Sequence, residues 1–390
     1  MSAARGWGWV AHLRAGGTTA WADWTGTGPD AGRFLPGAQQ LELLRRLNQA
    51  GTPSAALAAR VLDASAPGRG RPDLGLVGAA GPARFGPAPV DPADLPAREL
   101  LRVAAGLIAE DLAAGPRPEA GAGAGSGSTT GTRLAAAARV RLPVLRRGIR
   151  QLAGDPAQVP VLRAELARRG RPEGIPGAPV LVLGADLPTL LARSWTARVL
   201  AGGAPAWPDW VHAAVRRGRL PRRADPARVA AEWADRVGAH RVTVVLDPDA
   251  LPRLLGVRGP LPAPPALGAD AVELARRTAP ALGLLVSSAE RAALLRERLV
   301  PALLAAGGTG APPAVPARDL GWVRERAVGA RDALLAGGYP VVGEPDTLLS
   351  RSRTTTEDGP AATQATATEA GVLGLAVRLL LATDVREEGR

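Results

Sequence analysis

Short apolar segments that lead into an acidic turn and a helical stretch most strongly constrain how this chain folds. Residues 180–183 (VLVL) precede GAD and a stretch with helical spacing, and residues 242–246 (VTVVL) precede DPD and another such stretch. Apolar runs of this length that alternate with helices are typical of strands buried on both faces of a parallel sheet. Residues 339–342 form a further candidate strand, preceded by a predicted helix over 320–336. The expected fold class is therefore α/β, with a parallel sheet flanked by helices.

Two pairs of segments echo each other within the chain. AGGTTAWADW (15–24) and AGGAPAWPDW (201–210) are identical at seven of ten positions, and GAQQLELLRR (37–46) is echoed by GADAVELARR (268–277). The offsets between partners differ, 186 and 231 residues, so the chain is no simple tandem repeat. We interpret the N-terminal part as a shortened copy. W-x-x-W spacing puts two indoles on one helix face, where the alternatives are core packing and a stacking platform for a sugar or base.

Composition divides the chain into parts. Residues 115–133 are rich in Gly and Ser, which predicts a flexible linker between a mainly helical N-terminal unit (1–114) and an α/β domain (134–349). Residues 350–370 are rich in Thr, Ser and Ala, which predicts a disordered tail. Residues 371–390 are more apolar and predict a short C-terminal helix that docks on the body.

The chain contains neither lysine nor cysteine, so all 48 basic residues are arginine. A phosphate-binding loop of the GxxxxGK[ST] type, a Schiff base and a pyridoxal-phosphate anchor all need lysine and are excluded. Thiolate nucleophiles, disulfides and cysteine-ligated metals are excluded as well. The three histidines, His12, His212 and His240, lie in distant segments, and we expect no metal site.

The second half of the chain resembles a known family. WPDWVHAAVRRGRLP, then DPARVAAEWADRVGAHRVTVVLDPDALPRLLG, LGADAVELARR, and LGWVRERAVGARDALLAGGYPVVGEPDTLL follow the order found in bacterial sulfotransferase-like proteins of the P-loop fold, over residues 192–349. The resemblance implies a strand-loop-helix in which a Gly-rich loop and a lysine hold a phosphosulfate donor. This sequence has no lysine and no Gly-rich loop opening a helix at the expected early position. The resemblance therefore implies a degenerate form of the fold in which the donor-binding loop is not recognisable.

Acidic residues follow two of the predicted strands. In an open parallel sheet, ligands bind beyond the carboxyl ends of the strands, which places Asp186, Asp247 and Asp249 at the expected rim. They are candidate catalytic residues, as a general base or as ligands of a divalent ion. The alternative is structural, because an Asp in the turn before a helix caps backbone N–H groups.

The basic residues concentrate in the middle of the chain. Residues 133–223 contain 17 arginines and five acidic residues, so this segment carries the whole net charge of +12. Arg146, Arg147 and Arg150 lie just before a GDP turn that leads into a predicted helix, and an arginine-flanked helix start binds phosphate or sulfate. The alternatives are a structural G-[DE]-P turn and arginines that decorate solvated helix faces.

These observations lead to one principal expectation and two alternatives. We expect a diverged or non-catalytic sulfotransferase-like protein that binds an anionic small molecule or a protein partner through its arginine-rich middle. One alternative is an active group transferase that uses a nucleotide-type donor at the aspartate rim. The other is a nucleic-acid-binding protein. The sequence identifies no cofactor. It contains no apolar run long enough for a signal core or a membrane span, so we expect a cytoplasmic protein.

Overall fold

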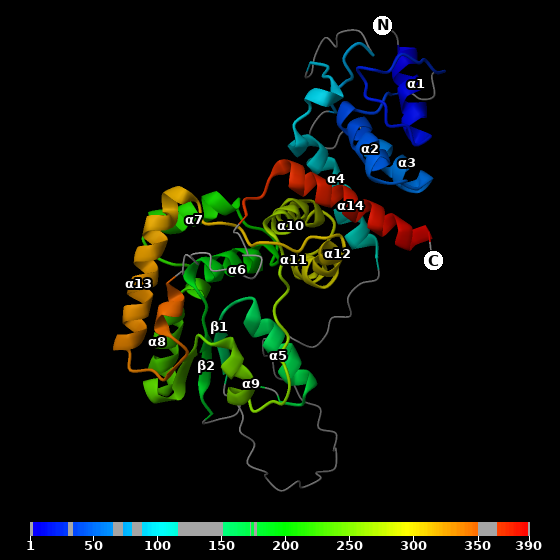
Figure 1. Ribbon diagram of the computed structural model, residues 1–390. Coiled ribbons are helices and arrows are strands. Elements are labelled where there is room, and N and C mark those ends of the chain that lie inside the picture. The colour runs from blue at the N-terminus through cyan, green and yellow to red at the C-terminus, as the bar shows by residue number, and fades with distance from the viewer. Residues whose placement is uncertain are drawn as a thin grey trace, which may run out of the picture.

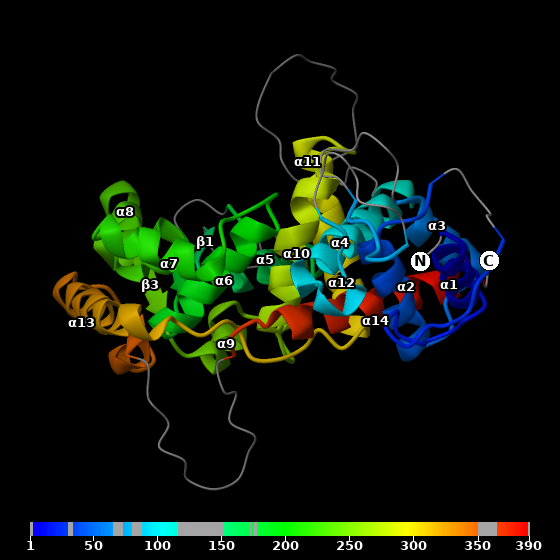
Figure 2. The ribbon, with the colours of Figure 1, turned by 90° about the horizontal axis from the view of Figure 1, so that it is seen from above.

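The computed structural model describes residues 3–29, 34–64, 73–79, 88–115, 151–171, 173–174, 178–349 and 365–388. These residues form an α/β protein that is mostly helical (Figure 1). The molecule is elongated, with the strands and their covering helices at one end and helices α1 to α3 at the other (Figure 2). The predicted linker lies almost wholly outside the described residues, as do residues 350–364 of the predicted tail.

A four-stranded parallel sheet forms the first part of the fold. Its strands are β1 (Gln151–Gly154), β2 (Val180–Leu183), β3 (Val242–Val245) and β4 (Val341–Val342). The strand order follows the chain, β1-β2-β3-β4. Every residue of β2 is buried, as expected for an interior strand of a parallel sheet covered on both faces. The predicted strands at 180–183 and 242–246 are thus confirmed almost to the residue.

Helices cover both faces of this sheet. On one face, Val180, Val182, Val242 and Val244 pack against α8 (Pro226–Val237) and α13 (Leu320–Ala336). On the other face, the alternate strand residues pack against α5 (Gln158–Arg168) and α9 (Leu251–Leu254). Successive strand residues point to opposite faces, so each continuous apolar run supplies both cores. We call these strands and the four helices the sheet unit.

Strand β1 was not predicted, because residues 151–170 were interpreted as a GDP turn leading into a helix. The helix α5 begins only at Gln158, and Gln151–Gly154 pairs with β2. Polar side chains cover the outer edge of β1. The Leu152 N–H donates to Glu173 Oε1 at 3.2 Å, and Arg163 donates to the Leu152 carbonyl at 2.8 Å. Side chains placed in this way protect an edge strand from pairing with another chain.

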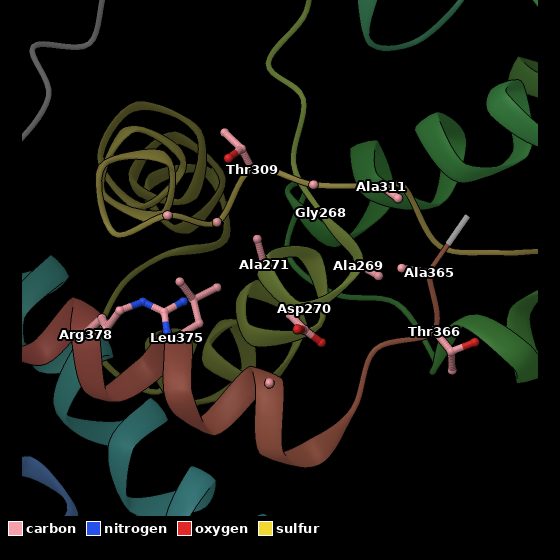
Figure 3. Close-up of a pocket in the computed structure, with 14 residues that line it drawn as sticks. Gly268, Ala269, Asp270, Ala271, Thr309, Ala311, Ala365, Thr366, Leu375 and Arg378 are labelled. Carbon is pink, nitrogen blue, oxygen red and sulfur yellow. The ribbon is translucent and has the colours of Figure 1, made fainter. Parts of the chain in front are cut away.

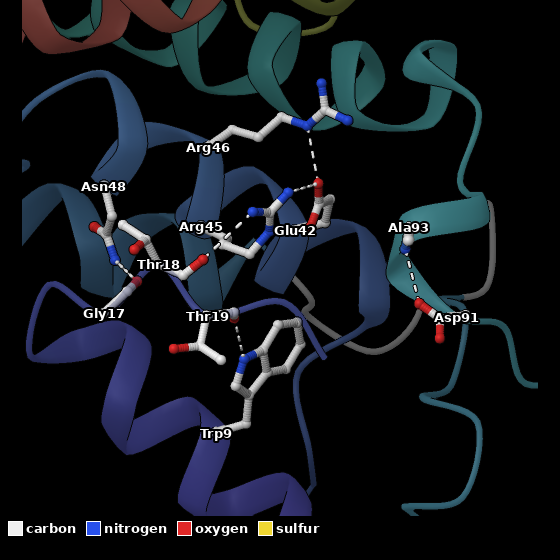
Figure 4. A network of polar contacts seen from close by, with 10 residues as sticks. All are labelled: Trp9, Gly17, Thr18, Thr19, Glu42, Arg45, Arg46, Asn48, Asp91 and Ala93. Atoms are coloured by element: carbon white, nitrogen blue, oxygen red, sulfur yellow. Dashed lines mark hydrogen bonds and ion pairs between the residues drawn. The ribbon is translucent and has the colours of Figure 1, made fainter. Parts of the chain in front are cut away.

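The N-terminal module consists of α1 (Ala3–Arg14), α2 (Ala38–Ala50), α3 (Ala55–Asp63) and α4 (Ala97–Ala114). Trp9 is fully buried and donates from Nε1 to the Thr19 carbonyl at 3.0 Å (Figure 4). The carboxylate of Glu42 is buried and accepts hydrogen bonds from Arg45 and Arg46. Trp21 begins a turn rather than lying on a helix face, which corrects the helical interpretation of the first W-x-x-W segment.

The C-terminal module consists of α6 (Leu187–Val199), α7 (Trp207–Arg216), α10 (Ala269–Leu282), α11 (Ser288–Leu294), α12 (Val300–Ala305) and α14 (Glu369–Glu388). Between α11 and α12 the helix continues as a π-helical turn, η5 (Leu295–Leu299). Short 3-10 helices are η1 (Pro92–Asp94), η2 (Arg222–Ala224), η3 (Ala239–Arg241), η4 (Pro248–Ala250), η6 (Ala317–Asp319) and η7 (Pro345–Leu348).

Tryptophan contacts of the N-terminal module recur in the C-terminal module. Trp195 donates to the Pro205 carbonyl at 3.0 Å, as Trp9 does to Thr19. The Trp195 and Trp207 rings are 5.4 Å apart and inclined by 59°, against 5.2 Å and 51° for the Trp9–Trp21 pair. Both W-x-x-W segments therefore take part in core packing.

A salt bridge on the central helix recurs as well. Glu273 on α10 accepts hydrogen bonds from Arg276 and Arg277, three and four residues later, in the arrangement of Glu42 with Arg45 and Arg46 on α2. The two echoed sequences GAQQLELLRR and GADAVELARR thus build the same charged contact on two different helices.

Backbone contacts between distant segments also match. The Ala38 N–H donates to the Leu74 carbonyl at 2.7 Å, and the Ala269 N–H donates to the Ala311 carbonyl at 3.0 Å. A parallel bridge joins Leu76 to Val90 in the N-terminal module, and another joins Pro313 to Ala365 in the C-terminal module. The two modules therefore share one set of contacts, which we call the common framework. The C-terminal module contains two long insertions relative to it. The insertion between α7 and α10 and the insertion between Pro313 and Ala365 both contribute strands and helices to the sheet unit.

The two modules pack against each other through their last helices. Helix α4 lies against both α10 and α14, and α14 also contacts α2 (Figure 1). Asp384 near the end of α14 accepts hydrogen bonds from the N–H of Ser54 at 2.6 Å and from its hydroxyl at 2.5 Å, at the start of α3. The predicted C-terminal helix begins at Glu369, two residues before the expected boundary. No helix in the described part of the chain has the length and hydrophobicity needed to cross a membrane.

Candidate functional site: an arginine-lined groove between the modules

A groove of about 600 Å³ lies where α4 of the N-terminal module meets α10 of the C-terminal module. We call it the α4–α10 groove. The residues that line it are Arg98, Glu99, Leu101, Arg102, Ala105, Arg276, Arg277, Pro280, Ala281 and Glu369. Four of these are arginines, two from each helix. Volumes in this range are typical of pockets for small organic ligands.

The α10 side of the groove carries two arginines held by one buried carboxylate. Arg276 contacts Glu273 through two hydrogen bonds of 2.6 and 2.7 Å, and Arg277 donates to the same carboxylate at 2.8 Å. Burial by itself raises the pKa of Glu273, but the hydrogen bonds from both arginines outweigh it, and the pKa lies below its ordinary value of 4.5. The hydrogen bond to Glu273 also raises the pKa of Arg276. One carboxylate thus holds both guanidinium groups in place.

The α4 side of the groove carries Arg98 and Arg102. Both form ion pairs with Glu99, at 3.9 Å and 3.5 Å respectively. The ion pair of Arg102 joins its buried Nε atom to Oε2 of Glu99. Glu99 thus pairs with both arginines of α4, as Glu273 pairs with both arginines of α10.

A second, smaller cavity of about 130 Å³ lies at the start of α10 (Figure 3). Its lining includes the glycine-rich segment 307–310, Asp270, Ala271 and Arg378. Asp270 accepts a hydrogen bond from the Thr368 N–H at 3.0 Å, and Arg378 donates from Nε to the Ala306 carbonyl at 3.0 Å. The first contact ties the residue before α14 to the start of α10, and the second ties the middle of α14 to the end of α12. We call this space the glycine cavity.

In the N-terminal module, side chains fill the space that corresponds to the glycine cavity. Gln39 and Gln40 are buried at the start of α2, and both amides donate to Asp73 Oδ1, at 2.9 and 2.8 Å. The matching backbone hydrogen bonds near the starts of α2 and α10 show which positions correspond. Gln40 corresponds to Ala271, and Asp73 corresponds to Gly310. Small residues at these two positions leave the cavity in the C-terminal module.

The aspartates predicted as catalytic residues lie beyond the carboxyl ends of the strands, as expected, and two of them act as caps. Asp186 accepts a hydrogen bond from the Thr189 N–H at 2.9 Å at the start of α6. Asp247 accepts one from the Asp249 N–H at 2.9 Å, and Asp249 lies in the first turn of η4. None of the three lines the α4–α10 groove or the glycine cavity.

Another rim carboxylate, Asp155, was not predicted as a site residue. It follows β1, is fully buried, and accepts hydrogen bonds from the N–H groups of Ala157 at 2.9 Å and Gln158 at 3.2 Å. Arg193 on α6 contacts its second oxygen. The Gly-Asp-Pro sequence at 154–156 was the signal that could have identified this residue. Its carboxylate stabilises the turn after β1 and, through Arg193, holds α6 against that turn.

The Nδ1 atom of His212 lies 3.5 Å from Oδ1 of the buried Asp319. His212 is on α7 and Asp319 ends η6. The imidazole lines neither the α4–α10 groove nor the glycine cavity. Its contact with Asp319 joins two segments that are far apart in sequence.

The basic middle segment was expected to hold the anion site. Arg146, Arg147 and Arg150 lie outside the described residues. Within residues 151–223, arginines pair with carboxylates in the following contacts: Arg163 with Glu173, Arg168 and Arg169 with Glu165, Arg193 with Asp155, and Arg222 with Glu232. Hydrogen bonds from Arg168 and Arg169 lower the pKa of Glu165 to about 2.

Across the described ranges, no three histidine or acidic side chains gather in a way that would hold a metal ion. Comparison of the chain with models of protein families, with curated proteins and with solved structures found no match.

The sequence analysis did not identify the residues of the α4–α10 groove, although it noted the paired arginines of GADAVELARR as part of an internal echo.

Proposed function

We propose that this protein binds a small organic anion in the α4–α10 groove. The observation that carries the proposal is the gathering of four arginines, two on α4 and two on α10, along one groove whose lining includes two carboxylates, Glu99 and Glu369. An anionic oxygen is the natural partner for such a cluster, because charge-assisted hydrogen bonds to arginine are short and strong.

The chemistry of the lining supports binding rather than catalysis. The groove residues carry guanidinium, carboxylate and apolar groups, with no hydroxyl or imidazole among them. The carboxylates of Glu99 and Glu369 are paired with arginines. General acid–base or nucleophilic catalysis needs a group free to take a proton or attack a substrate.

The proposal extends to the origin of the scaffold. We propose that the sheet unit is a diverged sulfotransferase-like fold that no longer carries a donor site. One feature supports this: the strands are parallel and are covered by helices on both faces.

Isothermal titration tests the binding site directly. We expect at least one of acetate, decanoate, citrate, phenyl phosphate and AMP to bind with one-to-one stoichiometry. Arg102→Gln should weaken that binding about tenfold or more, because it removes one of the four guanidinium groups that line the groove. No binding by any of the five anions, or binding unaffected by Arg102→Gln, contradicts the proposal.

The duplicated framework supplies a matched control. Arg276→Gln and Arg45→Gln remove the same contact, with Glu273 on α10 and with Glu42 on α2, but only Arg276 lines the groove. Both variants should lose similar stability in urea unfolding, and only Arg276→Gln should weaken binding. Equal loss of affinity in both variants would show that the effect arises from unfolding rather than from the groove.

A further inference from the structure

Four exposed arginines lie close together where the chain passes from α7 to α8. They are Arg216, Arg217, Arg219 and Arg223, and none of them pairs with a carboxylate of the described residues. Helices α7 and α8 both lie in the half of the molecule opposite helices α1 to α3 (Figure 2). We call residues 216–223 the arginine segment.

Acidic residues are scarce around the arginine segment and are engaged in other contacts. Asp225 is the single acidic residue in positions 210–231. Its carboxylate accepts a hydrogen bond from the Arg228 N–H at 3.0 Å, at the start of α8. Glu232 on α8 pairs with both Arg222 and Arg228. The four unpaired arginines therefore add their charges on one exposed surface.

The stability of α7 does not account for all four arginines. Arg216 and Arg217 lie at the carboxyl end of α7, where the helix dipole favours cations. Arg219 and Arg223 lie beyond that end, and the effect of the dipole falls off within the last turn. Like charges this close together in sequence repel one another, and a bound anion offsets that repulsion.

The arginine segment fits an extended anion better than a small one. None of its four unpaired arginines lines the α4–α10 groove or the glycine cavity. Duplex DNA carries one negative charge per about 1.7 Å of its axis, so several phosphates face any surface laid against it. Four exposed guanidinium groups on one surface match that repeated charge.

The surroundings of the arginine segment favour nucleic acid over a membrane or a protein. Leu220, the large apolar residue within the segment, is buried, and no exposed large apolar side chain occurs in residues 178–283. Segments that bind membrane surfaces carry apolar side chains that enter the lipid, and protein interfaces have an apolar centre. A phosphodiester backbone needs neither.

The side chains nearby favour a DNA duplex over other nucleic acids. Residues 211–232 contain no Phe, Trp or Tyr, whereas proteins bind single strands by stacking bases on such rings. Modules that recognise duplex RNA span about 16 base pairs, a greater length than the roughly 29 Å that eight extended residues reach. Arginine contacts to phosphate carry no information on base sequence.

We infer that the arginine segment binds duplex DNA through its phosphates, without preference for base sequence. The arginines donate hydrogen bonds to phosphate oxygens and displace the counterions of the duplex. This surface is separate from the α4–α10 groove, so the inference does not rest on the proposed function.

Fluorescence anisotropy of a labelled duplex of about 20 base pairs, titrated with the whole protein, tests the inference. At about 0.15 M salt the dissociation constant should lie between about 1 and 100 μM, the range of sequence-independent binding. Contact with four phosphates predicts that log K falls against log salt concentration with a slope of about −3.6. Two duplexes of unrelated sequence should bind with affinities within about twofold of each other.

Two variants with the same loss of charge locate the site. The first combines Arg216→Gln, Arg217→Gln, Arg219→Gln and Arg223→Gln, and it should weaken binding at least about tenfold and flatten the salt slope. The control removes four exposed arginines that also lack a carboxylate partner among the described residues but are spread over the molecule: Arg14→Gln, Arg253→Gln, Arg258→Gln and Arg296→Gln. It should change the affinity less than about threefold. Circular dichroism checks that both variants are folded.

A third variant keeps the charge of the arginine segment. Replacement of the same four arginines by lysine should leave the affinity within about threefold of the original, because counterion release depends on charge. This variant keeps the inference testable even if the glutamine variant fails to fold, since a loss of about tenfold in the folded lysine variant contradicts binding through charge.

The remaining results overturn the inference in distinct ways. No binding at low salt, a salt slope flatter than about −1.5, or equal losses in the two glutamine variants would show that the arginine segment does not hold the duplex. Tighter binding of duplex RNA, of a single strand, of polyglutamate or of phosphatidylserine vesicles than of duplex DNA would assign the surface to a different partner.

Discussion

The N-terminal and C-terminal modules are built on the same contacts but differ in what they leave open. Both bury a tryptophan pair, and both hold one glutamate between two arginines of a central helix. At the start of that helix, the N-terminal module fills its interior with Gln40 and Asp73, whereas the C-terminal module has a cavity beside Ala271.

The arginine pairs differ in the same way. Those of α2 do not line the α4–α10 groove, whereas those of α10 form one side of it. The shared contacts of the two modules fix the positions of the glutamate and the two arginines on the central helix. The neighbouring side chains then decide whether the space beside that helix is filled by the protein or open to a ligand.

Substitution of the buried tryptophans should give the largest losses of stability. Both modules depend on such a residue to the same extent. Trp9 and Trp195 are buried and each donates one hydrogen bond to a backbone carbonyl. Trp9→Ala and Trp195→Ala should each lower the free energy of unfolding by about 3–5 kcal/mol, because each leaves a large cavity. Urea unfolding monitored by circular dichroism measures the loss. If one variant lost less than about 1 kcal/mol of unfolding free energy while the other lost the expected amount, the two tryptophans would not be equivalent.

The buried glutamates should give intermediate effects. Glu42→Gln and Glu273→Gln each remove the charge between two arginines and should cost about 1–3 kcal/mol at neutral pH, because a buried charged partner loses its acceptor. A clear difference between the two variants would show that the groove beside α10 changes how well Glu273 is stabilised.

The Glu273 contact also predicts a pH dependence. Its folded pKa lies below the ordinary 4.5, so the stabilisation is complete well above pH 4.5 and is lost as the pH falls through the folded value. The unfolding free energy of the unmodified protein should therefore fall as the pH is lowered below about 5, and Glu273→Gln should reduce that slope. Thermal or urea unfolding across this range measures it; an unchanged slope in the variant contradicts the assignment.

The smallest effect should come from closing the glycine cavity. The triple variant Asp270→Gln, Ala271→Gln and Gly310→Asp places in the C-terminal module the two amides and the carboxylate that meet in the N-terminal module. We expect a gain of about 0.5–2 kcal/mol, typical of a filled cavity with satisfied polar groups. Ala271→Gln alone is the control and should gain nothing, because its amide lacks the carboxylate. A loss of stability in the triple variant would mean that the starts of α2 and α10 are not interchangeable.

Parts of this fold could be predicted from local sequence. Continuous apolar runs located β2 and β3, and the helix at Leu320–Ala336 was predicted to the residue. Strand β1 was missed because QLAG has only one strongly apolar side chain, Leu152, and precedes a Pro-containing turn. Its place in the sheet depends on pairing with β2, and on Glu173 and Arg163 at its outer edge.

The site was harder to predict than the fold. Asp186, Asp247 and Asp249 were expected at the rim from the order of strands and turns, and that is where they lie. The α4–α10 groove joins Arg102 to Arg276, residues that are 174 positions apart, and no local pattern shows that two helices from different modules will meet.

The sequence by itself determined the strands β2 and β3, the helices α13 and α14, the segments that the two modules repeat, and the chemistries that the absence of lysine and cysteine excludes. These follow from periodicity, identity and the inventory of side chains. Only the tertiary structure decided which arginines pair with which carboxylates and which four line the α4–α10 groove. That outcome depends on burial and on partners brought together by packing, and the free energy of a buried charge depends on its neighbours in space rather than in sequence.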